Sequence, residues 1–317
     1  MSTNINIEHL VLSGGGLLGI SYIGLYKYFE EKKIITNIKS ITGCSAGALF
    51  GSLFAIGYNS EELEIIVKSL IFKEYLNINV DSILNFINTK GFENGKKLNL
   101  LIKKCIKDKT GDENITFLQI QEKYNIKLQI GVTNLTKHKF ELFNIDTTPN
   151  IPIEKAISAS IAIPFIFEPI IIEDDIYCDG GLLDNLPIEN VINSSIINSN
   201  TNNTNNTSNT SNTSNTSNTN SLSIIGFYLI NKINLINKDN YKTVALSQYI
   251  NLITQTLSRN IITRKKEKDK EKENINYKII TIEIPYDIMT FIKINATHSD
   301  INNIIDIAYN ITKNELE

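Results

Sequence analysis

One serine of this chain has the setting of a nucleophile. Ser45 is the centre of Gly43-Cys44-Ser45-Ala46-Gly47, a GxSxG pattern between an apolar run and a helical pattern of small residues. In a nucleophile elbow, a sharp strand-to-helix turn exposes the serine hydroxyl, and flanking glycines relieve the crowding. The positive N-terminal end of the following helix favours negative charge beside the serine. We therefore expect Ser45 to attack an electrophile, and Cys44 to be a small packing residue.

A serine nucleophile needs a base, and the chain offers two kinds. Its histidines are His9, His138 and His298. Only His298 fits the order Ser, Asp, His of a hydrolase triad, but that fold has several strands before its nucleophile and only two are predicted here. The carboxylate candidate is Asp179, because Gly180 and Gly181 let the backbone turn sharply and bring it to another loop. Taken alone, the segment is explained equally well as a simple Asp-Gly turn.

A second glycine cluster follows the first predicted strand. Gly14, Gly15, Gly16 and Gly19 stand where that strand gives way to a helix, so backbone N–H groups can converge there on a phosphate or a transient oxyanion. The cluster also matches the dinucleotide pattern GxGxxG, which requires an acidic residue at the end of the second strand. That strand ends instead in Thr-Gly-Cys-Ser, and the nearest glutamates fall within the first helix. An oxyanion is therefore the better interpretation.

The elements that must position these residues alternate between apolar runs and helical patterns. Strands are predicted over Ile7–Ser13, Ile38–Thr42, Ile126–Asn134, Lys139–Phe143, Ile170–Ile172, Leu222–Ile230 and Tyr277–Ile284. Helices are predicted over Leu17–Lys32, Ala46–Ile56, Ser60–Phe72, Asp81–Asn88, Lys96–Lys107, Pro152–Ser160, Thr243–Arg264 and Ser299–Thr312. This alternation predicts an α/β fold with a mainly parallel sheet.

A tract without apolar residues divides the chain. Residues 198–221 are only Asn, Ser and Thr, so nothing there can be buried to offset the entropy of ordering. We expect a core over 7–190, a disordered insert over 191–221, and strands and helices over 222–317 that complete the same domain.

The composition of the chain excludes several classes of protein function. The chain has 317 residues, 42% of them apolar, so it can bury a sizeable core, and its net charge of −3 argues against a nucleic-acid binder. Its three scattered cysteines support neither a disulfide scaffold nor a zinc site. Neither a secretory signal nor an apolar run of the ~20 residues needed to span a bilayer is present. We expect a cytoplasmic protein that contacts membranes only peripherally.

The motifs taken together resemble the patatin-like phospholipase family. GGGLLG, GCSAG and DGG follow in the family's order, KAISASIAIP at 155–164 resembles its Ala-Ser-rich segment, and DGGLLDNLP at 179–187 resembles its DG[GA] stretch. The resemblance covers roughly residues 7–190. It implies a three-layer α/β/α sandwich, Ser45 as the nucleophile, Asp179 as the proton acceptor and an oxyanion loop at Gly14, Gly15 and Gly16. One departure is Leu18, which stands where many members carry a basic residue.

The resemblance also implies an activity. It is the hydrolysis of lipid acyl esters (phospholipid, lysophospholipid or acylglycerol) through an acyl-enzyme, without a metal or organic cofactor and with transient membrane contact. The apolar helices around 65–70 and 80–87 are candidates for an acyl channel or a membrane-facing cap, although core packing explains them as well. A Ser45–Asp179–His298 triad esterase and a catalytically silent lipid-binding protein are the alternatives.

Overall fold

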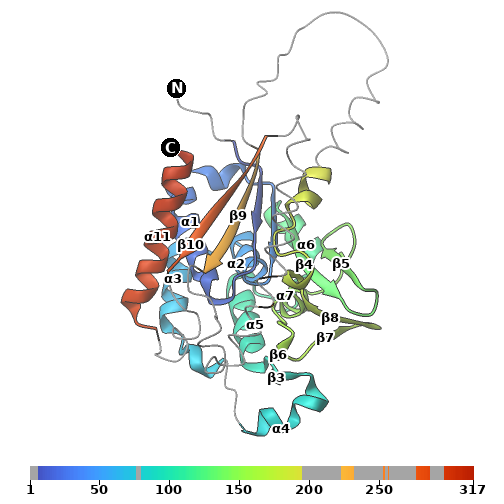
Figure 1. Ribbon diagram of the computed structural model, residues 1–317. Helices are drawn as coiled ribbons and strands as arrows, with labels where there is room; N and C mark the ends of the chain where they lie inside the picture. The colour runs from blue at the N-terminus through green and yellow to red at the C-terminus, as the bar shows by residue number, and fades with distance from the viewer. Residues whose placement is uncertain are drawn as a thin grey trace, which may run out of the picture.

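A twisted sheet forms the centre of the molecule, with helices packed against it (Figure 1). The computed structural model describes residues 6–75, 80–194, 223–231, 276–285 and 296–317, together with the two helical positions Ile253 and Thr256. The predicted α/β fold is confirmed.

Five neighbouring strands of this sheet are parallel. In spatial order they are β10 (Tyr277–Ile284), β9 (Ile224–Asn231), β1 (His9–Leu12), β2 (Ser40–Cys44) and β4 (Lys127–Asn134). Three strands with antiparallel partners complete the sheet: β5 (Lys139–Phe143) and β8 (Asp175–Asp179) both pair with β4, and β7 (Ile170–Ile172) pairs with β8. The strands from beyond residue 222 thus join the same sheet as the N-terminal strands.

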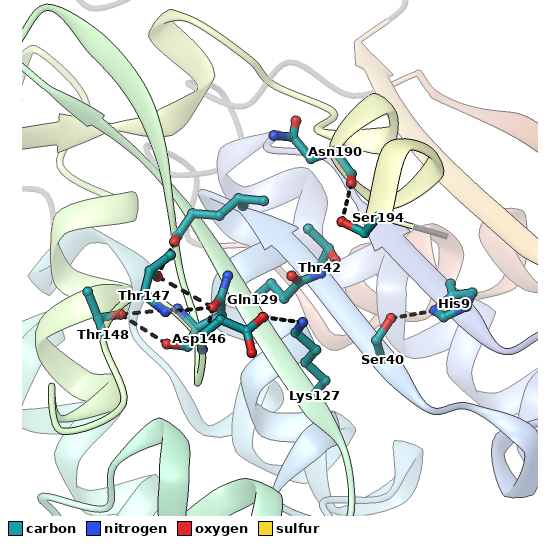
Figure 2. A network of polar contacts seen from close by, with 12 residues as sticks. His9, Ser40, Thr42, Lys127, Gln129, Asp146, Thr147, Thr148, Asn190 and Ser194 are labelled. Atoms are coloured by element: carbon teal, nitrogen blue, oxygen red, sulfur yellow. Dashed lines mark hydrogen bonds and ion pairs between the residues drawn. The ribbon is translucent and has the colours of Figure 1, made fainter. Parts of the chain in front are cut away.

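Both faces of the sheet are buried, which explains why its strands are nearly continuous apolar runs. In β1, Leu10 and Leu12 lie in the main core, whereas Val11 points to the other face and joins a second cluster with Ile188 and Ile192. The second face also carries a buried polar pair, because the Gln129 side-chain amide donates to the Thr42 hydroxyl at 2.8 Å (Figure 2).

Most of the described helices contribute side chains to the main core. They are α1 (Ser21–Glu31), α2 (Ala46–Ala55), α3 (Ser60–Ser69), α5 (Lys96–Thr110), α6 (Phe117–Tyr124), α7 (Ile153–Ser160) and α11 (His298–Leu316). The short helices are η1 (Gly16–Ile20), η2 (Ile34–Asn37), η3 (Phe72–Glu74) and η4 (Gly180–Leu182). Away from this body, α4 (Val80–Thr89) lies beside the small parallel pair β3 (Gly91–Glu93) and β6 (Phe165–Phe167).

A helix over 188–194 packs on the second face. This helix corrects the expected start of the insert at 191, because Val191 and Ile192 are buried against the sheet and keep the chain helical to residue 194. The remainder of that insert lies outside the described residues, as does the helix predicted over 243–264 except at Ile253 and Thr256.

Helix α6 has a local signal that the sequence analysis did not use. The Thr116 hydroxyl accepts from the Gln119 backbone N–H at 3.4 Å, and the Gln119 side chain accepts from the Thr116 N–H at 2.8 Å. This capping box is a recognised helix start.

Among the helices that the structure describes, none is both long and apolar enough to cross a membrane.

Gly24 controls how closely the last helix packs. A Cβ on Gly24 of α1 would collide with the Ile305 carbonyl group of α11 and lie 2.9 Å from the Tyr309 backbone nitrogen. We predict that Gly24→Ala lowers the free energy of unfolding by about 2 kcal/mol, because α11 must move outward. Urea denaturation measures this change. Lys27→Ala, at an exposed position of the same helix, is the control and should leave the midpoint nearly unchanged; equal midpoints for both variants would contradict the prediction.

Candidate active site

Ser45 occupies a strained turn between β2 and α2. Its backbone dihedrals are φ 51° and ψ −121°, a region that non-glycine residues rarely adopt. Gly43 and Gly47 permit this turn, because a Cβ on Gly43 would collide with the Gly47 carbonyl, and one on Gly47 would collide with the Leu12 carbonyl. The turn therefore requires glycine at both of these positions.

Sheet topology brings Asp179 to Ser45 across 134 positions of sequence. Strand β4 pairs with both β2 and β8 at successive positions, with Cys44 opposite Gly131 and Asp179 opposite Val132. The Ser45 hydroxyl donates to Asp179 Oδ2 at 2.5 Å, and the two residues are only 5% and 4% exposed. The structure thus makes the contact that a serine–aspartate dyad requires.

Burial dominates the electrostatics of Asp179. Its Oδ1 accepts from the Gly181 backbone N–H at 2.7 Å, and none of its ion pairs or hydrogen bonds in the described structure involves a cation. Loss of water raises the pKa of this carboxyl to about 6, although the bonds from Ser45 and Gly181 act in the opposite direction. The group is therefore a stronger base than an ordinary aspartate, yet it is ionised at neutral pH.

Ser160 holds the nucleophile turn and was missed by the sequence analysis. The Ser45 backbone N–H donates to Ser160 Oγ at 2.8 Å, and the Ser160 hydroxyl donates to the Gly131 carbonyl at 2.6 Å. This fully buried hydroxyl joins the end of α7 to the turn and to β4. The Ala-Ser-rich segment contained it, but nothing in the segment indicated the partner.

The glycine loop after β1 supplies fewer free donors than its sequence predicted. The Gly14 N–H donates to Asn185, at 3.1 Å to Oδ1 and 3.2 Å to the backbone oxygen, and the Asn185 amide donates to the Gly14 carbonyl at 3.2 Å. Gly14 is thus clamped rather than available. The next two N–H groups, of Gly15 and Gly16, make no hydrogen bond within the part of the chain that the structure describes, and Gly16 is exposed with φ +56°.

Two of the remaining predicted glycines, Gly19 and Gly180, act through close packing. A Cβ on Gly19 would lie 2.8 Å from Ala46 Cβ, so Gly19 lets η1 approach α2. A Cβ on Gly180 would collide with the Gly131 carbonyl and lie 2.8 Å from Cys44 Sγ. Gly181 is the backbone donor to Asp179. Leu18 is buried in the main core.

The structure places the histidines elsewhere. His298 begins α11, and its Nε2 lies 3.0 Å from the Lys68 carbonyl at the end of α3. His9 lies at the start of β1, where its Nδ1 is 2.8 Å from Ser40 Oγ, at the strand end opposite to Ser45 (Figure 2). His138 is exposed in the turn between β4 and β5. None of the three contacts Ser45 or Asp179 among the interactions described.

The dinucleotide interpretation lacks its carboxylate. Glu30 accepts from the Ser60 backbone N–H at 3.0 Å and from its hydroxyl, so it serves the start of α3. Within the described residues no three His, Cys, Asp or Glu side chains are grouped to hold a metal ion. What the site offers is a hydroxyl bonded to a buried carboxylate, next to a glycine loop with two N–H groups that have no partner in the described structure.

Comparison with known proteins bears on the family of this chain. A family model described as patatin-like phospholipase matches residues 10–192. The chain is 36% identical over 183 residues to uncharacterized protein R571 of Acanthamoeba polyphaga mimivirus, covering 57% of this chain and 60% of that protein. It is 31% identical over 182 residues to the probable lipid hydrolase 463L of Invertebrate iridescent virus 6, covering 57% and 61%. It therefore spans about 60% of the length of these relatives.

Two further comparisons extend to a eukaryotic protein and to a solved structure. Triacylglycerol lipase 4 of Saccharomyces cerevisiae is 31% identical over 178 residues, which cover 52% of this chain and 18% of the lipase. The crystal structure of VipD from Legionella pneumophila superposes with a TM-score of 0.50 at 17% identity, covering 99% of this chain and 67% of VipD, which supports the fold alone. The family match covers more than half of the sequence, and the chain belongs to the patatin-like phospholipase family.

Proposed function

We propose that this protein is a serine acyl hydrolase that cleaves the acyl esters of lipids through a Ser45–Asp179 dyad. The observation that carries the proposal is the 2.5 Å bond between Ser45 Oγ and Asp179 Oδ2, because both groups are buried and Ser45 sits in a strained strand-to-helix turn. Strain at a polar residue of this kind marks functional sites.

Acylation begins with transfer of one proton. Ser45 Oγ attacks the ester carbonyl carbon while Asp179 Oδ2 takes the hydroxyl proton, so a carbon–oxygen bond forms and the carbonyl oxygen becomes negative. We assign stabilisation of this charge to the free N–H groups of Gly15 and Gly16 and to the positive end of α2. A well-placed backbone donor contributes roughly 3–4 kcal/mol to such a transition state.

Loss of the alcohol completes acylation, and attack by water then reverses these roles in deacylation. The intermediate collapses, the protonated Asp179 gives its proton to the departing alcohol, and the acyl group stays on Ser45. A water molecule then gives a proton to Asp179 and attacks the acyl carbon. The fatty acid leaves and Ser45 regains its proton. No step in this sequence requires a metal or an organic cofactor.

Lipid esters are the proposed substrate class because of the family and its named relatives. Triacylglycerol lipases and lysophospholipases are among the similar proteins, each matched over part of its length. Phospholipid, lysophospholipid and acylglycerol esters share the carbonyl that this mechanism attacks. A substrate embedded in a bilayer also requires the enzyme to contact the membrane surface transiently.

Covalent labelling of Ser45 tests the proposal. A fluorophosphonate probe should label the native protein and leave Ser45→Ala unlabelled, and hydrolysis of a phospholipid and acylglycerol panel should fall about 10³-fold or more in that variant. His298→Ala should keep most of the activity, since this side chain contacts α3 rather than the dyad. Absence of labelling in the native protein would favour a silent lipid-binding protein, and a comparable loss in His298→Ala would favour the triad.

The raised pKa of Asp179 sets the pH profile. Asp179 accepts a proton only when ionised, so kcat/KM should rise with pH through about 6 and level off above it. The profile of His298→Ala should keep this inflection, because the titrating group is the carboxyl. A profile that stays level down to pH 4 would contradict Asp179 as the base.

The same burial predicts a cost in stability. In the folded protein the pKa of Asp179 is raised above its unfolded value, so the stabilising protonated form is lost as pH rises through about 6. Asp179→Asn should therefore abolish hydrolysis and yet raise the free energy of unfolding at pH 8, by up to about 3 kcal/mol, with a smaller gain near pH 4. Urea denaturation at both pH values measures the gain.

Asp175→Asn is the matched control on the same strand. The Lys137 ammonium lowers the pKa of Asp175, which predicts the opposite direction: this variant should lose stability at neutral pH. If Asp179→Asn also proved less stable at pH 8, burial would not be the cause of its raised pKa.

A further inference from the structure

An exposed aromatic and aliphatic cluster extends from the body of the molecule at α4, β3 and β6. We call Phe86, Ile87, Phe92 and Phe165 the apolar tip. The Phe86 ring stacks on Phe92 at 4.5 Å between centroids and lies 6.3 Å from the Phe165 ring. Even so, Ile87 is 76% exposed and Phe165 is 55% exposed. Large apolar side chains gathered in contact with water indicate an interaction surface.

Phe165 adds an independent sign that the tip has a function. Its φ is +69°, in the left-handed region where a bulky residue is a genuine outlier. Burial of the ring does not compensate for this strain, because more than half of the side chain faces water. Asparagine or glycine would adopt the same conformation more easily. A strained and exposed phenylalanine suggests selection for contact with something outside the chain.

The tip is connected directly to the candidate active site. Phe165 follows Ser160, whose hydroxyl holds the Ser45 turn, and Ala162, whose carbonyl accepts from the Asp179 N–H at 2.9 Å. In Figure 1, α4 lies at the end of the molecule toward which the arrowheads of β9 and β10 point. Ser45 also follows the carboxyl end of a strand parallel to these, so the tip and the dyad share one end of the sheet.

Positive charge accompanies the tip. Lys96 and Lys97 lie in the first turn of α5, where the helix dipole disfavours cations. Along the same helix, Lys96, Leu100 and Lys104 form an exposed stripe at intervals of four residues. Leu100 is 67% exposed. None of these three lysines forms an ion pair in the described part of the chain, although the half-buried Glu93, at the end of β3, and Glu168, just after β6, lie nearby. An anionic partner would stabilise lysines placed in this way.

We propose that the apolar tip and the lysine stripe of α5 form a docking surface for an anionic phospholipid bilayer. The apolar side chains enter the interface between head groups and acyl chains, while the lysines contact the negative surface. The proposal deepens the proposed function, on which it rests, because it places the dyad beside the membrane that holds a lipid substrate. A protein partner would not by itself require cations alternating with an exposed leucine along a helix.

Vesicle sedimentation tests the surface separately from catalysis. The full chain carrying Ser45→Ala, which cannot consume the lipid, is mixed with vesicles of phosphatidylcholine alone or with about 30% phosphatidylglycerol. We expect stronger binding to the anionic vesicles, weakened by salt. Adding Ile87→Ser and Phe165→Asn together should lower the partition coefficient about tenfold or more. Lys96→Gln with Lys97→Gln should remove the preference for anionic vesicles.

Two controls keep the result interpretable. Ile65→Ser replaces another exposed isoleucine, 63% exposed on α3, and should bind vesicles like the parent protein. Phe165→Asn should melt at the same temperature as its parent or higher, because strain is relieved, so lost binding cannot be attributed to unfolding. Equal binding by the tip variants and the parent would overturn the surface, as would equal binding to both vesicle types. Failure of Ser45 to react with a fluorophosphonate would instead overturn the proposed function and leave the vesicle result unchanged.

Discussion

A buried carboxylate that has no cation beside it among the described residues is the constraint on which the site depends. Asp179 is removed from water, and within the described structure its carboxylate accepts hydrogen bonds only from the Ser45 hydroxyl and the Gly181 backbone N–H. Partial compensation of this kind leaves the ionised form costly, and the pKa of the group rises to about 6 for that reason. A nearby lysine or arginine would stabilise the fold but would also weaken the base. The site therefore depends on the surrounding chain to keep it dry and in contact with the nucleophile.

Close backbone packing provides that rigidity. Gly43, Gly47 and Gly180 stand where a side chain would collide with a neighbouring carbonyl, so the strands and loops around Ser45 approach more closely than other residues allow. Asn185 then joins the glycine loop to the segment after Asp179 through reciprocal bonds with Gly14. Because one side chain fixes both loops, displacement of the base loop would also displace the candidate oxyanion donors.

Local features of this architecture can be predicted from the sequence, whereas most of its long-range contacts cannot. Strands buried on both faces read as apolar runs, so β1, β2 and β4 were predicted close to their observed bounds, and the Ser45 turn has a motif of its own. The hydrogen bonds of Ser160 and Asn185 could not be predicted, because their partners lie 115 and 171 positions away in the sequence. Nothing in the sequence distinguishes these two residues from a serine or an asparagine at the surface. The short pair of β3 with β6 depends on tertiary register rather than on local preference.

Backbone strain separates functional positions from ordinary turns in this chain. Seven non-glycine residues in the described structure have positive φ. Five of them are exposed polar residues, Lys33, Lys90, Asn125, His138 and Glu173, in turns where the left-handed conformation has little consequence. The other two are Ser45, which is buried, and Phe165, which is apolar and exposed. Neither can be explained by turn formation alone, and the segment from Ser160 to Phe165 connects them. If Phe165 contacts the lipid surface, docking acts directly on the segment that holds the nucleophile. Membrane contact is then coupled mechanically to the alignment of the dyad.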